Sequence, residues 1–192
     1  MENQDRTESI PWQRREDLGF FPALWQTVEQ VLFRPLEFFN SLEIKKSQLE
    51  PFLFYLTIFT AVAVISELFK KALLRQFSPA LFLFLFILPL FVAAAIYIGS
   101  AFVHLFVILF GGQGGFIGTF NVLAYNAATG IFNIIPLIGG VVGAVWGAVV
   151  VVTGFKKVHN LSTPKALGAY LIPLFILGAL LTAGLLMVKL RP

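Results

Sequence analysis

The feature that most constrains this chain is the near absence of charge over its central part. No acidic residue occurs from Leu68 to Pro192, and no lysine, arginine, aspartate or glutamate occurs from Gln76 to Phe155. A soluble protein needs charged residues to cover its surface, whereas a charge at the centre of a bilayer costs about 2.5–3.5 kcal/mol. The sequence therefore predicts an all-α integral membrane protein that crosses the bilayer several times.

The composition agrees with a membrane protein and excludes several other classes. Hydrophobic residues make up 58% of the chain and charged residues 12%, against about 25% charged in an ordinary soluble domain. The basic residues after residue 50 lie in small groups beside apolar segments, so we expect no nucleic-acid partner. Because there is no cysteine, disulfides and thiolate metal sites are excluded, and we expect no cofactor. The polar N-terminus lacks the pattern of a removable signal peptide.

Residues 1–50 are predicted to form a cytoplasmic N-terminal segment that contains one amphipathic helix. Its first part, Met1–Ile10, is polar and expected to be disordered. Apolar side chains then recur at helical spacing along one face, with polar side chains opposite. The apolar set is Phe21, Leu24, Trp25, Val28, Val31 and Leu32, and the polar set is Gln26, Thr27 and Gln30. We expect this helix to lie in the membrane interface with Trp25 at headgroup depth; packing on a soluble core is the alternative.

Residues 51–188 are predicted to form one domain of five membrane-spanning helices. The first span follows a capping pattern, Ser47 to Glu50, with Pro51 just inside the helix. Residues 81–110 would form about 45 Å of helix, too long for one upright span and too short for two. We therefore expect one helix there, tilted or kinked at Pro89. The predicted spans are Pro51–Phe69, Leu81–Phe110, Thr119–Ile135, Val141–Gly154 and Ala166–Val188.

Two connections and the overall topology complete this prediction. Gly111–Gly115 matches no phosphate-binding loop and is predicted to be a turn. A re-entrant hairpin over residues 119–154 is the alternative to two full spans. Five crossings put the termini on opposite sides, and a cytoplasmic N-terminus leaves nine basic residues inside and five outside. The excess of basic residues inside favours that orientation.

Small and polar residues within the predicted spans are the candidate functional residues. Three glycines at four-residue spacing predict a close helix–helix contact. These are Gly139, Gly143 and Gly147. The candidate intramembrane polar residues are Glu67, His104, Asn121, Asn126 and Asn133. Glu67 precedes Lys70 and Lys71 by three and four residues, which predicts a helical surface ion pair, with a buried functional carboxylate as the alternative. The asparagines are expected to hydrogen-bond between helices.

No catalytic or metal site is predicted from these polar residues. Ser100 and His104 share a helix face, but a serine nucleophile also needs an oriented base and an oxyanion hole, and the sequence indicates neither. A two-histidine helical metal motif with a glutamate is absent, and so are paired carboxylates. We therefore expect that the protein is not an enzyme.

The stretch from Phe120 to Ala166 resembles the Yip (Ypt-interacting protein) domain family, specifically its bacterial members. The matching positions are Ala124, Tyr125, Pro136, Gly139, Gly140, Trp146, Gly154, Lys157, Val158, His159, Ser162 and Ala166. Residues 11–39 resemble the segment that often precedes the domain, although the cysteine-rich zinc-binding segment of some relatives has no counterpart. The resemblance implies a five-span helical domain with a cytoplasmic N-terminus, and for a bacterial member it implies the inner membrane. Eukaryotic members are adaptors that bind Rab-type GTPases, and the family offers no agreed catalytic residues.

Two functions are consistent with these features. The first is a non-enzymatic membrane scaffold or adaptor, whose partners would be the lipid bilayer and a membrane protein, a cytoplasmic protein or a second copy of the chain. The second is a small-solute or ion permease with a polar path near Asn121, Asn126, Asn133 and His104, because interrupted helices recur in transporters. Convergence of those side chains on one cavity would indicate transport, and separate contacts would indicate a scaffold.

Overall fold

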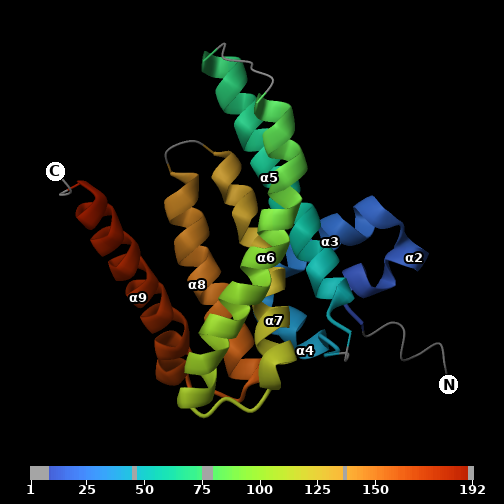
Figure 1. The fold of residues 1–192 in the computed structure, drawn as a ribbon. Helices are drawn as coiled ribbons and strands as arrows, with labels where there is room; N and C mark the ends of the chain where they lie inside the picture. Colours follow the sequence, from blue (N-terminus) through green and yellow to red (C-terminus); the bar gives the residue numbers. More distant parts are fainter. Residues whose placement is uncertain (1–8, 45–46, 75–79, 136–137, 190–192) are drawn as a thin grey trace.

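The structure, a computed structural model, describes residues 9–44, 47–74, 80–135 and 138–189 as an assembly of helices (Figure 1). The elements are η1 (Pro11–Arg14), α2 (Arg15–Leu18), α3 (Phe20–Phe33), α4 (Pro35–Ser41), α5 (Leu49–Leu74), α6 (Ala80–Leu109), α7 (Gly115–Tyr125), η2 (Asn126–Ile134), α8 (Gly139–Val158) and α9 (Thr163–Lys189). The predicted all-α class is confirmed for these residues.

Four of the helices are long and apolar enough to cross a membrane. They contain the segments Leu49–Phe69, Ile87–Leu109, Gly139–Val158 and Thr163–Lys189. The chain is therefore a multi-pass membrane protein. The single long helix predicted for the second span is confirmed, because α6 runs from Ala80 to Leu109 with Pro89 inside it.

The predicted span Thr119–Ile135 differs from the other four. It corresponds to α7 followed directly by the 3-10 helix η2, and Figure 1 shows the two running one after the other alongside α8. At the junction Thr129 donates a hydrogen bond to the Asn126 carbonyl (2.9 Å), a three-residue reach that suits the tighter 3-10 winding. Neither piece alone is long enough to span, so a fifth crossing stays a prediction.

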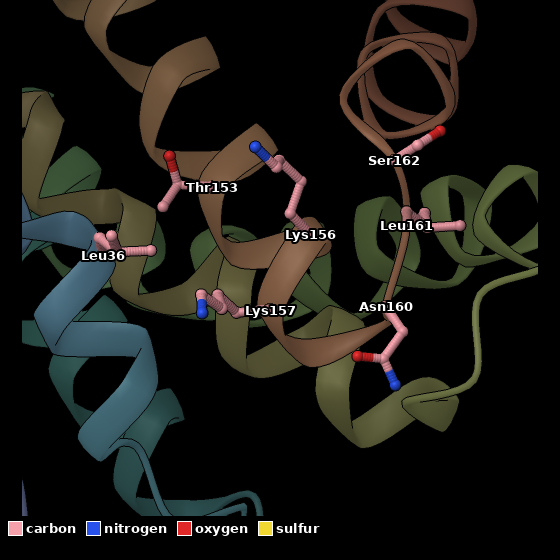
Figure 2. Close-up of a pocket in the computed structure, with 7 residues that line it drawn as sticks. All are labelled: Leu36, Thr153, Lys156, Lys157, Asn160, Leu161 and Ser162. Carbon is pink, nitrogen blue, oxygen red and sulfur yellow. The ribbon is translucent and has the colours of Figure 1, made fainter.

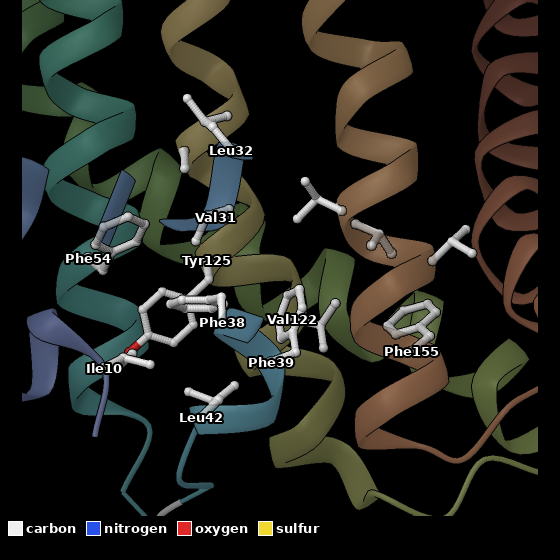
Figure 3. Close-up of a cluster of buried hydrophobic side chains, with 14 of the residues drawn as sticks. Ile10, Val31, Leu32, Phe38, Phe39, Leu42, Phe54, Val122, Tyr125 and Phe155 are labelled. Carbon is white, nitrogen blue, oxygen red and sulfur yellow. The ribbon is translucent and has the colours of Figure 1, made fainter. Parts of the chain in front are cut away.

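The N-terminal head, defined here as residues 10–42, shares one hydrophobic core with the long helices. Phe38 of α4 packs on Tyr125 of α7, which also packs on Phe54 of α5. Phe39 and Leu42 belong to the same cluster (Figure 3). Trp12 donates from Nε1 to the Glu50 carbonyl (2.8 Å). The head is therefore packed on the membrane domain instead of standing apart from it.

The head differs from the prediction at its start and along α3. Residues 1–8 lie outside the described residues, but Ile10, predicted to be disordered, is buried in the core. Thr27, assigned to the polar face, is buried, whereas Phe21 and Trp25 are 78% and 62% exposed. The buried arc of α3 is rotated toward Ala23, Thr27 and Val31, because this side of the helix meets the rest of the protein.

The start of α5 keeps half of the predicted capping box. Ser47 Oγ accepts a hydrogen bond from the Leu49 backbone N–H (3.3 Å). The Glu50 carboxylate, in contrast, forms a bidentate ion pair with the Arg15 guanidinium of α2. A two-bond Arg–carboxylate pair is stronger than a neutral side-chain cap, so Glu50 joins the head to α5.

Candidate functional site

Three hydrogen-bonded polar side chains from different elements meet at one end of the bundle. Here α6 and α8 end and α7 and α9 begin (Figure 1). His104 Nδ1 of α6 lies 2.8 Å from Thr119 Oγ1 of α7, and Thr119 Oγ1 lies 3.1 Å from Nε2 of His159, which follows α8. We call His104, Thr119 and His159 the histidine chain.

The backbone sets the direction of the hydrogen bonds in the histidine chain. The Gly114 N–H donates to His159 Nδ1 (3.0 Å), and a backbone N–H can only donate, so this nitrogen carries no proton. In a neutral ring the proton is then on Nε2, which donates to Thr119 Oγ1. The threonine hydroxyl in turn donates to His104 Nδ1. Every polar atom between Gly114 and His104 is satisfied by this one arrangement.

Glycines allow the loop after α6 to approach His159 closely. Gly111 and Gly115 have φ values of +86° and +63°, which glycine adopts without steric cost. A Cβ at Gly114 would overlap the Val158 carbonyl oxygen and lie 2.9 Å from His159 Nδ1, and a Cβ at Gly112 would lie 2.5 Å from Val107 Cγ1. The segment is a turn, as predicted, and the missing side chain at Gly114 lets the backbone lie against Val158 and His159.

The electrostatics of the site favour neutral histidine. His159 is fully buried, and this burial, together with the nearby His104, lowers the pKa of His159 to about 4. Protonation would also place a second N–H against the Gly114 N–H. Thr119 is buried as well, so a substrate could not reach the hydroxyl without opening the fold. The geometry suits a fixed structural connection between α6, α7 and α8.

The serine–histidine pair considered from the sequence is not formed. Ser100 Oγ is buried and has no hydrogen-bond partner among the described residues, and His104 Nδ1 is bonded to Thr119 instead. The sequence does not single out Thr119, because a lone threonine near a helix start carries no distinctive pattern.

The three asparagines lie in different surroundings. Asn121 donates to the Ile117 carbonyl (2.8 Å) within α7, so this bond is not the expected interhelical one. Asn126 faces α8, where a Cβ at Gly147 would lie 3.4 Å from its amide. Asn133 lines a pocket of about 360 Å³ that is also lined by Ser66 of α5 and several apolar side chains. Glu67 lies on α5, while the Lys70 side chain lies outside the described residues.

The glycine positions of α8 all face neighbouring elements. A Cβ at Gly139 would overlap the Phe132 carbonyl of η2, a Cβ at Gly143 would lie 3.1 Å from the Thr129 carbonyl oxygen, and one at Gly147 would lie 3.2 Å from Thr129 Oγ1. Gly140 is less crowded, since the nearest atom to its Cβ position is Asn133 Oδ1 at 3.6 Å. Pro136 lies outside the described residues.

Three further residues of the resemblance connect the head to the bundle. Trp146 of α8 donates from Nε1 to the Leu32 carbonyl of α3 (2.8 Å). A Cβ at Gly154 would lie 2.6 Å from Val122 Cγ1 and 2.9 Å from Phe39 Cζ. Tyr125 is fully buried, its ring packs on Phe38 and Phe54 with 5.1 Å between centroids, and its hydroxyl has no partner among the described residues.

Two more residues of the resemblance, Lys157 and Ser162, line an open pocket of about 750 Å³ (Figure 2). This pocket lies between the end of α8, the start of α9 and Leu36 of α4. Its complete lining is Leu36, Thr153, Lys156, Lys157, Asn160, Leu161 and Ser162.

The comparisons with known proteins agree with the resemblance. The family model of the Yip1 domain matches residues 30–185, which include the end of α3, all of α4 to α8 and most of α9. A search of curated proteins gave no match, and a search of solved structures gave none either.

Proposed function

Because the chain belongs to the Yip1 domain family, we propose that it is a non-enzymatic membrane scaffold whose head holds a protein partner at the membrane surface. The observation that carries this proposal is the firm attachment of the head to the bundle. The head contributes to the main hydrophobic core, and Trp12, Trp146 and the Arg15–Glu50 pair add polar connections. A surface on the head is thereby held at a constant position relative to the bilayer.

The head offers an apolar face for such a partner. Phe21, Trp25 and Phe33 of α3 are 78%, 62% and 73% exposed, and exposed aromatic side chains are favoured at protein interfaces. The same side chains can also rest in the membrane interface. By the bias of basic residues, we place this face on the cytoplasmic side.

The polar groups of the bundle support a scaffold more than a permease. His104 is bonded to Thr119, Asn121 is bonded within α7, and Asn133 lines a mainly apolar surface pocket. A transport path needs polar groups that converge on one water-accessible route. Among the described residues these candidates make separate contacts, and the buried Asn126 Oδ1 has no partner, so they do not converge on one route.

Site-specific photocrosslinking in native membranes tests the proposal. A photoreactive phenylalanine analogue replaces Phe21 on the head, and the matched control carries it at Phe175 of α9, which is 74% exposed. We expect a protein adduct of defined mass from the Phe21 position and lipid adducts alone from the Phe175 position.

A second substitution makes the crosslinking result specific. Trp25→Ser, one helical turn from Phe21, should reduce the Phe21 adduct at least several-fold while leaving the melting temperature unchanged, because Trp25 is exposed. Equal protein adducts at both positions, or no protein adduct at Phe21, would contradict the scaffold proposal. Solute uptake into proteoliposomes that is lost in Asn133→Ala would favour the permease instead.

A further inference from the structure

We propose that the pocket at the end of α8 binds the phosphate of an anionic lipid headgroup. This inference goes beyond the scaffold function and does not depend on a protein partner. It rests on the charge, chemistry and depth of the pocket in Figure 2.

The positive charge of the pocket is unbalanced. Lys156 and Lys157 are both exposed, and neither forms an ion pair with any residue that the structure describes. Glu37, the acidic residue of α4, lies 3.8 Å from Arg34, and no acidic residue occurs after Glu67 in the chain. Figure 2 shows the Lys157 side chain extending from α8 toward Leu36, and the Lys156 side chain extending along α8 toward Thr153. Two lysine side chains at one pocket, neither ion-paired among the described residues, make its lining positive and attract an anion.

The uncharged lining complements a phosphodiester. Asn160 has φ +54° and, with Ser162, contributes an amide and a hydroxyl that can donate to phosphate oxygens. Leu36 and Leu161 provide apolar contacts at two sides of the pocket. The volume of about 750 Å³ is within the range of small-molecule sites and accommodates a glycerophosphate group.

The depth of the pocket selects a lipid as the source of the phosphate. Lys156 and Lys157 occupy the last turn of a membrane-spanning helix, and the next span begins at Thr163. The pocket therefore lies where lipid headgroups are concentrated. Basic pockets between spans on the cytoplasmic side are typical sites for acidic lipids, and the predicted topology puts this end there. A lipid bound here would also contact α4 of the head through Leu36.

Native mass spectrometry of the purified full-length chain in detergent tests this inference. Phosphatidylglycerol and phosphatidylcholine are titrated separately, and the bound fraction is measured for each. We expect a clear preference for phosphatidylglycerol. Each neutralised lysine should weaken that binding about fivefold, so Lys156→Gln/Lys157→Gln should weaken it about 25-fold, whereas Lys156→Arg/Lys157→Arg should retain it.

A matched variant controls for total charge. Lys71→Gln/Lys189→Gln also removes two positive charges, but from the last turns of α5 and α9. These turns lie at the opposite end of the bundle (Figure 1). It should bind phosphatidylglycerol within twofold of the wild type. All variants change exposed or partly exposed side chains, and an unchanged melting temperature confirms their fold.

Two results would overturn the inference. One is equal binding of phosphatidylglycerol by the wild type and Lys156→Gln/Lys157→Gln. The other is displacement of bound phosphatidylglycerol by millimolar inorganic phosphate, which would show that the pocket takes a free anion and not a lipid.

Discussion

Replacing Gly154 by alanine should destabilise the protein because this position joins three elements. Gly154 lies in α8, and a Cβ there would lie 2.6 Å from Val122 Cγ1 of α7 and 2.9 Å from Phe39 Cζ of α4. Carbon atoms that are not bonded pack at about 3.5–4.0 Å. Val122 and Phe39 are both buried in the main core, so neither can move the required ~1 Å without displacing its own neighbours.

The magnitude follows from a comparison with Gly178→Ala. Gly178 also lies inside a long helix, α9, but a Cβ there would have no atom within 4 Å. Alanine improves helix propensity by up to about 1 kcal/mol in both cases, and this gain cancels in the comparison. The remaining difference is the cost of overpacking, typically about 1–3 kcal/mol. With roughly 2–4 °C per kcal/mol for a chain of this length, the two melting temperatures should differ by about 2–12 °C.

The assay is thermal unfolding in one detergent, followed by circular dichroism, for the wild type and both variants. Val122→Ala removes the closest methyl groups, so adding it to Gly154→Ala should recover part of the loss, giving a favourable coupling in a double-mutant cycle. If Gly154→Ala melts at or above the temperature of Gly178→Ala, the argument from close packing is refuted.

Three further predictions concern the buried polar groups. Tyr125→Phe should raise the free energy of unfolding by about 1 kcal/mol, because it removes a buried hydroxyl that lacks a partner among the described residues; a lower melting temperature would contradict this. The free energy of unfolding should fall as the pH is lowered from about 6.5 to 4, because in this range the His159 imidazole binds a proton in the unfolded state but not in the folded state, where its pKa is about 4. The loss is at most about 3 kcal/mol. Urea titrations across this range should show a smaller loss for His159→Gln than for the wild type. Trp146→Phe removes the hydrogen bond to the Leu32 carbonyl, so it should lower the free energy of unfolding by about 1 kcal/mol and speed proteolysis of the head. Trp25→Phe, at an exposed position, should change neither quantity.

Several sequence predictions are confirmed because they depend on local properties. The length and apolarity of residues 81–110 predicted one long helix, and α6 is that helix. The glycines from Gly111 to Gly115 predicted a turn, and two of them have positive φ values. Helical period, apolar length and backbone conformation are properties of neighbouring residues, so they can be judged without knowing what each segment packs against.

Other features were not predictable because they join distant parts of the chain. The periodicity of residues 21–32 indicated a helix but assigned Thr27 to the wrong face, since α3 has apolar side chains over much of its circumference and its packing partners decide which of them are buried. Nothing in the pattern around Glu50 indicated that Arg15 would be its partner instead of the helix start.

The sequence by itself determined that lipid surrounds this protein and which segments are apolar helices. The reason is that the free energies of transfer of the residues from water to lipid add up along a segment and do not depend on what that segment packs against. Only the tertiary structure decided that the head is packed on the membrane domain and that His104, Thr119 and His159 are connected. The physical reason is range: a hydrogen bond or a close glycine contact joins atoms only a few ångströms apart, and here it joins residues such as Leu32 and Trp146, 114 positions apart.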